Sequence, residues 1–230
     1  MNKLSIRLET IASLVPFGAR VCDIGTDHGY LSIHLKNSNI AKSVIATDLN
    51  EKPLLTAKKN IDLSGTKGID LRLGNGLAPV KKGEADTVII AGMGGEVISG
   101  ILAECEWIKN DKITLILQPT TSADALRRFL NQNGFEIKSE KAVSENRKLY
   151  SVMVVSYNGI KTVKSEFFYY IGLLKPTSEA EISYIKKQQK ILLNCISSLE
   201  NIPSKQEDFI KYKNAYSGIT QILTEYNNGI

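Results

Sequence analysis

The sequence is poor in the residues from which metal sites and disulfide frameworks are built. It has three cysteines, Cys22, Cys105 and Cys195, and two histidines in 230 residues. The cysteines lie far apart and are odd in number, so they predict neither a disulfide framework nor a CxxC metal site. No His, Cys and Asp residues have the spacing of metal ligands, and no Ser–His–Asp arrangement can be read. We therefore expect no metal and no hydrolase triad.

Long apolar runs and a strong charge bias are missing as well. No apolar stretch approaches the roughly 20 residues of a membrane span, and the first residues have no signal-peptide core. The net charge is +5, with 20 basic and 17 acidic residues up to residue 157 and 9 and 7 after it. A dedicated nucleic-acid-binding protein has a much stronger basic stripe. We expect a soluble, cytoplasmic protein with no membrane partner, and charge alone barely favours nucleic acid.

Up to residue 157, strand-like and helical segments alternate, which is the βαβ pattern of a parallel sheet. The last two strand-like segments, 135–142 and 148–157, follow one another directly, so we expect an antiparallel pair at one edge. This pattern predicts a doubly wound α/β sheet, Rossmann-like, with the final hairpin typical of S-adenosylmethionine (SAM)-dependent methyltransferases. The other expected strands are 20–24, 43–47, 69–73, 87–90 and 113–117, and the expected helices are 30–36, 51–63, 95–103 and 122–132.

After residue 157 the β pattern stops and we expect helices. Apolar residues recur at steps of three and four in two stretches of equal length, separated by a turn signal at residues 201–204. This pattern predicts an antiparallel coiled-coil hairpin, with a short helix at 166–175 before it. The expected domains are 1–157 and 158–230. The expected seams are Ile182, Ile185, Gln189, Leu192, Ile196 and Leu199, and Phe209, Tyr212, Tyr216, Ile219, Leu223 and Tyr226.

A glycine-rich turn, Asp23-Ile24-Gly25-Thr26-Asp27-His28-Gly29, follows the first expected strand. Glycines let the backbone approach a ligand closely, and the next helix offers free N–H groups to it. Tyr30 stands where the dinucleotide pattern GxGxxG needs its third glycine, which argues against NAD. An acidic residue suits the cationic amino group of SAM. The turn therefore predicts SAM binding by Asp23, Gly25, Thr26, Asp27 and His28, with an ordinary strand-to-helix turn as the alternative.

Two further strands end in polar residues. Asp48 closes the second strand and is followed by Leu49, and a carboxylate there can accept both hydroxyls of a ribose. Taken alone, Asp48 can equally be a helix N-cap. Asn75 and Gly76, after the third strand, stand where such folds hold an adenine ring, with a plain turn as the alternative. Together these residues extend the predicted cofactor site.

The fourth strand is followed by Ala91-Gly92-Met93-Gly94-Gly95. Methyltransferases that act on amino groups of DNA bases carry an Asn- or Asp-Pro-Pro-aromatic motif at this position, and here that motif is absent. Its absence fits a ring nitrogen as nucleophile, because an in-plane lone pair attacks a methyl group directly and positioning does most of the catalysis. We place Gly92 and Met93 in the cofactor site, with close helix–sheet packing at the glycines as the alternative.

These motifs closely resemble those of the bacterial tRNA (adenine-22-N1)-methyltransferases, over nearly the whole chain. The resemblance includes Leu4-Ser5-x-Arg7-Leu8-x-x-Ile11-Ala12 and Leu117-Gln118-Pro119, while Asn75 stands where Asp is usual. It implies methylation of adenine N1 in tRNA with SAM as donor. It also implies that Asp27 is the favoured catalytic residue and that Arg7 and Tyr30 lie near the mouth as substrate-binding residues. The residues that it places in the cofactor pocket are Gly25, Asp27, His28, Asp48, Asn75 and Met93.

Several alternatives stay open from the residues alone. His28 can simply cap a helix or pack, and we expect Trp107 to pack rather than to stack on a base. The substrate of the enzyme can be a small molecule or a protein instead, or the chain can bind SAM or RNA without turnover. Residues 158–230, which include the helical hairpin, have nine lysines and no arginine, so the hairpin can contact tRNA phosphates or a second subunit. We expect a monomer, with a weak dimer through these helices as the alternative.

Overall fold

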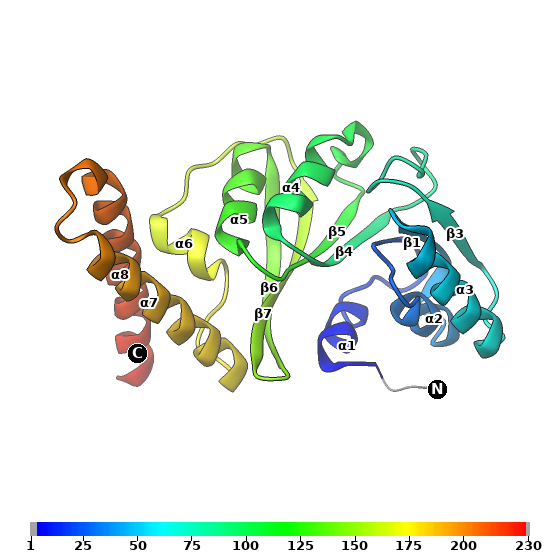
Figure 1. The fold of residues 1–230 in the computed structure, drawn as a ribbon, viewed down its shortest axis with the longest axis horizontal. Helices are drawn as coiled ribbons and strands as arrows, with labels where there is room; N and C mark the ends of the chain where they lie inside the picture. The colour runs from blue at the N-terminus through cyan, green and yellow to red at the C-terminus, as the bar shows by residue number, and fades with distance from the viewer. Residues whose placement is uncertain (1–3, 229–230) are drawn as a thin grey trace.

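A seven-stranded sheet forms the centre of the computed structural model, which describes residues 4–228 (Figure 1). Its strands are β1 (Ala19–Ile24), β2 (Ala41–Asp48), β3 (Ile69–Leu73), β4 (Thr87–Met93), β5 (Thr114–Pro119), β6 (Phe135–Glu145) and β7 (Lys148–Tyr157). They lie in the order β3-β2-β1-β4-β5-β7-β6. The first five are parallel, and β7 pairs antiparallel with both β5 and β6. The predicted α/β sheet and its antiparallel final hairpin are confirmed.

Helices cover both faces of the sheet because successive strand side chains point to opposite sides. Ile89 packs in the core beneath α1 (Ile6–Ala12) and α2 (Tyr30–Asn37), whereas its neighbour Ile90 packs beneath α4 (Gly95–Ala103) and α5 (Ala123–Gln132). Both isoleucines are fully buried, and each such burial contributes roughly 1.5–3 kcal/mol. The helix α3 (Glu51–Ser64) packs beside β3, and the 3₁₀ helix η1 (Glu106–Ile108) follows α4. Apolar strands thus build two separate cores.

The helix α1 was not among the predicted helices. The Oγ of Ser5 accepts the backbone N–H of Leu8 at 3.4 Å and caps it, and Ile11 and Ala12 are buried. Seven residues are too few for a readable helical period, which explains why the pattern did not reveal it. The strand β4 ends at Met93, three residues beyond the predicted end, so Gly92 belongs to the carboxyl end of this central strand.

After β7 the chain is helical, with α6 (Glu166–Ile171), α7 (Glu179–Leu199), the 3₁₀ turn η2 (Pro203–Lys205) and α8 (Gln206–Asn227). Figure 1 shows α7 and α8 running in opposite directions, and Gln189 Nε2 donates to Thr220 Oγ1 between them at 2.8 Å. The predicted antiparallel helix pair is confirmed, while a regular heptad supercoil remains a prediction. None of the helices within residues 4–228 combines the length and apolar character that crossing a membrane requires.

The helices α7 and α8 pack against each other and also against α6 and the sheet. Ile185, Leu192 and Ile219 of the predicted seams are buried, but Tyr226 is 46% exposed. Phe167 of α6 lies against α8, where a Cβ on Gly218 would come within 2.3 Å of its ring. Leu149 and Ala142 of the β6–β7 hairpin join the same cluster. The helices therefore share their apolar surface with α6 and the sheet, and the division at residue 157 remains a prediction.

A buried ion pair joins the sheet to these helices. Nη2 of Arg127, on α5, donates to Oε1 of Glu140, on β6, at 2.5 Å, and both side chains are fully buried. Nη1 of Arg127 donates to the carbonyls of Tyr169 and Tyr170 at 2.7 and 3.0 Å, and Leu173 N donates to Oε2 of Glu140 at 3.1 Å. Burial disfavours the Arg127 charge, but the Glu140 carboxylate outweighs burial and raises the pKa of the guanidinium. Loss of either partner leaves an unpaired buried charge, which costs about 3–5 kcal/mol.

Candidate active site

The turn after β1 joins the ends of three strands. The backbone N–H groups of Gly25 and Thr26 both donate to the carbonyl of Thr47 on β2, at 2.8 and 3.0 Å. Gly25 has φ +73°, and a Cβ at this residue would lie 2.3 Å from Cε of Met93, the last residue of β4. Both the backbone conformation and the closeness of Met93 therefore favour glycine here. The structure brings Gly25, Thr26 and Met93 together.

Asp23 lies beneath this turn. Its side chain is buried, and Oδ2 accepts hydrogen bonds from Thr26 Oγ1 and Ser32 Oγ, both at 2.8 Å. Burial raises the pKa of this carboxyl, and the hydrogen bonds from Ser32 and Thr26 oppose the rise. These contacts tie the turn to α2. Asp23 thus shapes the turn, and its direct contact with a cofactor remains a prediction.

Asp27 and His28 form an exposed pair at the tip of the turn. Asp27 Oδ2 lies 3.3 Å from His28 Nε2, and the two side chains are 65% and 49% exposed. Asp27 has φ +52°, a conformation that costs on the order of 1 kcal/mol in a residue with a Cβ. Gly29, rather than His28, occupies the N-cap of α2. Backbone strain of this kind is concentrated at functional sites, which favours a ligand-facing role for Asp27.

The ends of β2 and β3 lie side by side next to the turn. Gly74 N donates to the Asp48 carbonyl at 2.9 Å, and Thr47 Oγ1 donates to the Gly76 carbonyl at 3.3 Å. The Asp48 side chain accepts the Asn50 N–H through Oδ1 at 2.9 Å. Its second oxygen, Oδ2, takes part in no hydrogen bond within residues 4–228, so Asp48 can still accept a hydroxyl group.

Two exposed side chains stand near this carboxylate. Leu49 is 63% exposed, and Asn75 lies at a cavity of about 460 Å³ that Leu77, Ile101 and Trp107 also line. An exposed leucine together with a carboxylate and an amide suits the flat face and polar edge of a nucleoside. The prediction that Trp107 packs against the core is confirmed.

Arg7, Gln118 and Gly92, each from a motif named above, form a cluster at the ends of β4 and β5 that the sequence did not predict. Nη1 of Arg7 donates to Oε1 of the buried Gln118 at 2.7 Å, and the same oxygen accepts Gly92 N at 3.1 Å. Arg7 N donates to Oε1 of Glu145 at 2.9 Å, and the guanidinium lies 5.8 Å from the centre of the Tyr150 ring. Arg7 thus joins α1, both strand ends and the β6–β7 hairpin. In the sequence, Gln118 was visible only within the motif Leu117-Gln118-Pro119, which carried no predicted role.

Tyr30 contacts the glycine turn through an aromatic stack. Its ring stacks on that of His28, with 5.4 Å between the centroids. It lies at a depression that Leu4, Ile33 and Asn60 also line. The contacts within residues 4–228 thus link Tyr30 to the turn through His28. Its place at the mouth of the site remains a prediction.

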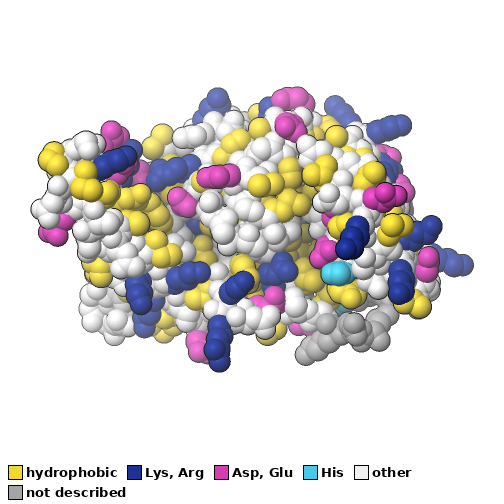
Figure 2. All heavy atoms as spheres, viewed as in Figure 1, with side chains coloured by type: hydrophobic (Ala, Val, Ile, Leu, Met, Phe, Trp, Pro, Cys, Tyr) yellow, Lys and Arg dark blue, Asp and Glu magenta, His cyan; other side chains and the backbone are white. Residues whose placement is uncertain are grey.

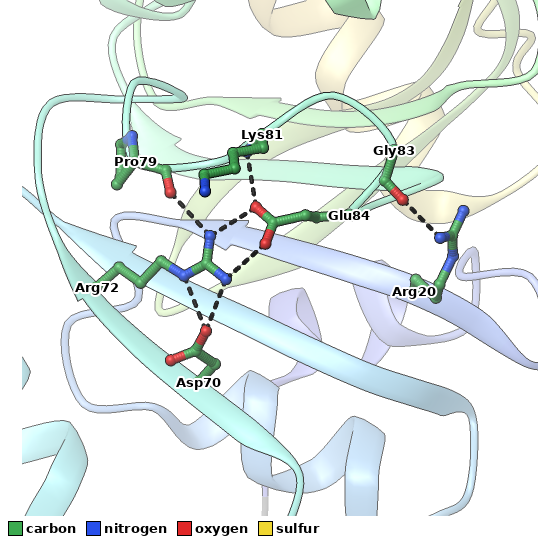
Figure 3. A network of polar contacts seen from close by, with 7 residues as sticks. All are labelled: Arg20, Asp70, Arg72, Pro79, Lys81, Gly83 and Glu84. Carbon is green, nitrogen blue, oxygen red and sulfur yellow. Dashed lines mark hydrogen bonds and ion pairs between the residues drawn. The ribbon is translucent and has the colours of Figure 1, made fainter.

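An ionic network holds the connection between β3 and β4 (Figure 3). Arg72 binds both carboxylate oxygens of Glu84, at 2.7 and 3.0 Å, and its Nε donates to Asp70 Oδ2 at 2.8 Å. Arg72 also donates to a backbone carbonyl of the connection, and Glu84 accepts one of its backbone N–H groups. The hydrogen bonds from Arg72 lower the pKa of Glu84 to about 2. Because Asn75 lies in this connection, the network helps to fix its position.

The site as a whole offers carboxylates, an amide and a glycine turn. Within residues 4–228, no group of three or more His, Cys, Asp or Glu side chains is arranged to hold a metal ion. Asp27 is the exposed carboxylate at the turn, and Asp48 is the carboxylate at the next strand end. This set fits a nucleoside that carries a cationic amino acid.

Comparison with known proteins gives the family. Residues 4–153 match a family model described as a methyltransferase domain. The chain is 39% identical over 166 residues to the tRNA (adenine(22)-N(1))-methyltransferase of Bacillus subtilis (strain 168), a match that covers 69% of this chain and 70% of that protein. The chain belongs to the tRNA (adenine-22-N1)-methyltransferase family. The resemblance that the motifs indicated is confirmed.

Solved structures of this methyltransferase family match the C-terminal helices too. The crystal structure of the B. subtilis m1A22 tRNA methyltransferase TrmK has a TM-score of 0.84 and 28% identity, and the match covers 96% of this chain and 99% of that one. M. capricolum TrmK in complex with S-adenosyl-homocysteine has a TM-score of 0.76 and 29% identity, with 95% and 96% covered. The arrangement of sheet and helices seen here is therefore shared with these enzymes.

We expect Glu84→Gln to change the pH dependence of stability. Because the pKa of Glu84 falls from 4.5 to about 2 on folding, its contribution is fully present above pH 4.5 and is lost as the pH falls through about 2. The wild-type protein should therefore exceed the variant most in free energy of unfolding near pH 7, and the difference should shrink on acidification. Urea unfolding at pH 7, 4 and 3 measures this. Glu104→Gln, at an exposed residue, is the control, and a difference that stays constant with pH would contradict the expectation.

Proposed function

We propose that this protein transfers the methyl group of SAM to N1 of adenine 22 in tRNA. The observation that carries the proposal is the family membership, together with a site in which the ends of β1, β2 and β4 meet at one glycine turn. A sequence with a dinucleotide-binding turn would need a third glycine where Tyr30 stands.

The residues at the strand ends fit SAM. A Cβ at Gly25 would overlap the terminal methyl group of Met93, so this glycine lets the turn lie close to the end of β4. The absence of a hydrogen bond to Oδ2 of Asp48 within residues 4–228 supports a role for this oxygen in accepting the ribose hydroxyls. The exposure of Leu49 and the place of Asn75 at a cavity support contact with the adenine ring. Asp27 suits the cationic amino group. The proposed cofactor-binding residues are Asp23, Gly25, Thr26, Asp27, His28, Asp48, Leu49, Asn75, Gly76, Gly92 and Met93.

Bound SAM supplies a methyl group made electrophilic by its sulfonium. The in-plane lone pair of adenine N1 needs no prior deprotonation, so the new C–N bond forms as the C–S bond breaks and leaves its electron pair on sulfur. The protein contributes mainly orientation. The methylated ring carries a positive charge, and the carboxylate of Asp27 orients the base and then accepts a proton from it. Arg7, held by Gln118 and Glu145, stands where the base enters.

The C-terminal helices are proposed as a second region of tRNA contact. The N1 atom lies on the Watson–Crick edge of adenine, so the target base must leave its pairing partner and the enzyme must hold the surrounding RNA. The apolar stripe of α7 and α8 is already covered in part by α6 and the β6–β7 hairpin, which supports a monomer.

Nucleoside analysis tests the proposed reaction directly. The purified protein is incubated with methyl-labelled SAM and bacterial tRNA, which is then digested and analysed by mass spectrometry. We expect 1-methyladenosine, and none of it when the tRNA transcript carries guanine at position 22. Label on a protein or small molecule and not on tRNA would show a different substrate. No label transfer to any acceptor, despite SAM binding, would show a binding module without turnover.

Asp27→Asn separates a catalytic role for Asp27 from a structural one. Asparagine tolerates the same left-handed conformation and has the same shape, so the free energy of unfolding should change by less than about 0.5 kcal/mol. Loss of the carboxylate should lower kcat about 100-fold or more if Asp27 accepts a proton. Steady-state kinetics at saturating SAM and tRNA measures kcat. Unchanged kcat would remove Asp27 from the mechanism.

Gly25→Ala tests the cofactor turn against a matched glycine. Gly18 has nearly the same φ, +77°, but a Cβ there meets no atom within 4 Å. Alanine therefore strains the backbone at both positions, by about 1 kcal/mol, and crowds the site only at Gly25. We expect the Kd for SAM, measured by calorimetry, to rise at least tenfold in Gly25→Ala and to stay unchanged in Gly18→Ala. Equal effects would indicate general destabilisation instead of a lost cofactor contact.

A further inference from the structure

A cleft of about 390 Å³ lies between the sheet and the C-terminal helices, outside the cofactor site described above. One wall is formed by residues 119–124, which follow β5, and by the start of β7. The other wall is formed by α6, α7 and α8, which contribute Tyr170, Lys187, Ile191 and Tyr212. The cleft therefore lies where two parts of the chain that are far apart in sequence meet.

The buried Arg127–Glu140 pair holds the two walls of this cleft together. Nη2 of Arg127 donates to Ser151 Oγ at 3.3 Å on the sheet side and to Tyr184 OH at 3.5 Å on the helix side. Both of these residues also line the cleft. Since the ion pair is inaccessible to water, the spacing between the walls is set by the fold itself. The cleft is thus a fixed feature of the protein.

The lining has the chemistry of a nucleotide site. Four tyrosines line it, namely Tyr150, Tyr170, Tyr184 and Tyr212. Tyr184 is buried and its hydroxyl accepts from Arg127, so the other three offer their rings and hydroxyl groups. Burial raises the pKa of Tyr170, so its phenol stays neutral at physiological pH. The ammonium group of Lys187, on an exposed residue of α7, supplies the positive charge that a phosphate needs. Proteins bind unpaired nucleotides with this combination of aromatic rings for bases and cations for the backbone.

The cleft adjoins Arg7 and its partner Gln118. Tyr150 lines the cleft and also lies beneath the guanidinium of Arg7. Pro119 lines it too, directly after Gln118, which binds Arg7. In Figure 2, basic side chains follow one another across the lower half of this face, from the helix pair toward the middle of the molecule. An RNA strand whose target base enters beside Arg7 can therefore continue into this cleft.

We propose that the cleft binds the nucleotide next to the target adenine, its base against the tyrosine side chains and its phosphate at Lys187. This inference rests on the proposed function, because it names a second subsite for the same tRNA. A base that turns out of a helix leaves its neighbour unstacked, and the cleft replaces the lost stacking. Recognition of this neighbour also helps to distinguish the target from other adenines.

Ile191→Trp tests the cleft by filling it. Ile191 is 41% exposed and lines the cleft, whereas Leu193 on the same helix is 46% exposed and does not. Leu193→Trp is therefore the matched control. We expect Ile191→Trp to raise the KM for tRNA between about fivefold and 100-fold, the range for loss of one stacked base. The KM for SAM and the melting temperature should stay unchanged. Equal KM values for tRNA in the two variants would overturn the proposal.

Lys187→Ala gives a second measurement that leaves the packing intact. Lys190 is exposed on the same helix and does not line the cleft, so Lys190→Ala is its control. A larger rise in the KM for tRNA with Lys187→Ala than with Lys190→Ala supports binding of the phosphate in the cleft. Equal rises would indicate general attraction to RNA and would overturn the proposal. If the wild-type protein methylates no tRNA, the proposed function itself fails, which is a distinct outcome.

Modified substrates identify the nucleotide. Two tRNA transcripts are compared. One has an abasic residue directly before the target adenine, and the other has an abasic residue directly after it. One of them should raise the KM of the wild-type enzyme, and Ile191→Trp should add no further rise with that transcript, because the same contact is already lost. Independent, multiplying effects with both transcripts would show that the cleft holds neither neighbour.

Discussion

The arrangement of the whole chain depends on the ion pair between Arg127 and Glu140. Both groups are fully buried and charged, so neither is tolerable without the other. Arg127 lies on a helix of the sheet's outer layer, yet it binds the carbonyls of Tyr169 and Tyr170 in the first C-terminal helix. Close packing around the pair leaves no alternative, since a Cβ at Gly172 would overlap the Glu140 carboxylate. The C-terminal helices are thereby docked in one orientation against the sheet.

This docking connects the cofactor site with the helices. The β6–β7 hairpin passes between α1 and α7 and contacts both (Figure 1). On one side, Glu145 holds Arg7 at the end of the parallel strands. On the other, Leu149 packs into the cluster of the C-terminal helices. Burial opposes the Glu145 charge, but the contacts with Arg7 outweigh it and lower the pKa of this carboxyl. One hairpin thus sets the distance between the place of methyl transfer and the surface proposed to hold the RNA.

The sequence predicts most of the fold because strands buried on both faces are apolar without interruption, as in residues 88–91. The glycine turn was equally readable, since Gly25 must adopt a left-handed backbone. The Arg127–Glu140 pair could not be predicted, because charged residues are normally exposed at the surface. Nothing in the local sequence shows that these two residues meet. The resemblance includes Gln118, but its hydrogen bonds with Arg7 and Gly92 were not predicted for a similar reason, because no local pattern shows that these distant residues meet. Tyr226, the last residue of the second expected seam, is 46% exposed, and the seam itself remains a prediction, because the periodicity of a sequence does not show how far a partner helix covers it.

The contacts of Arg7 also have a consequence for how the protein is made. Its partners Gln118 and Glu145 lie 111 and 138 residues further along the chain. During synthesis from the N-terminus, α1 lacks these partners until residue 145 has left the ribosome. The contacts of the glycine turn with Thr47 need only the first part of the chain. Contacts between distant residues form late because a long loop must close first. The glycine turn and the contacts of Arg7 are therefore completed at different stages of folding.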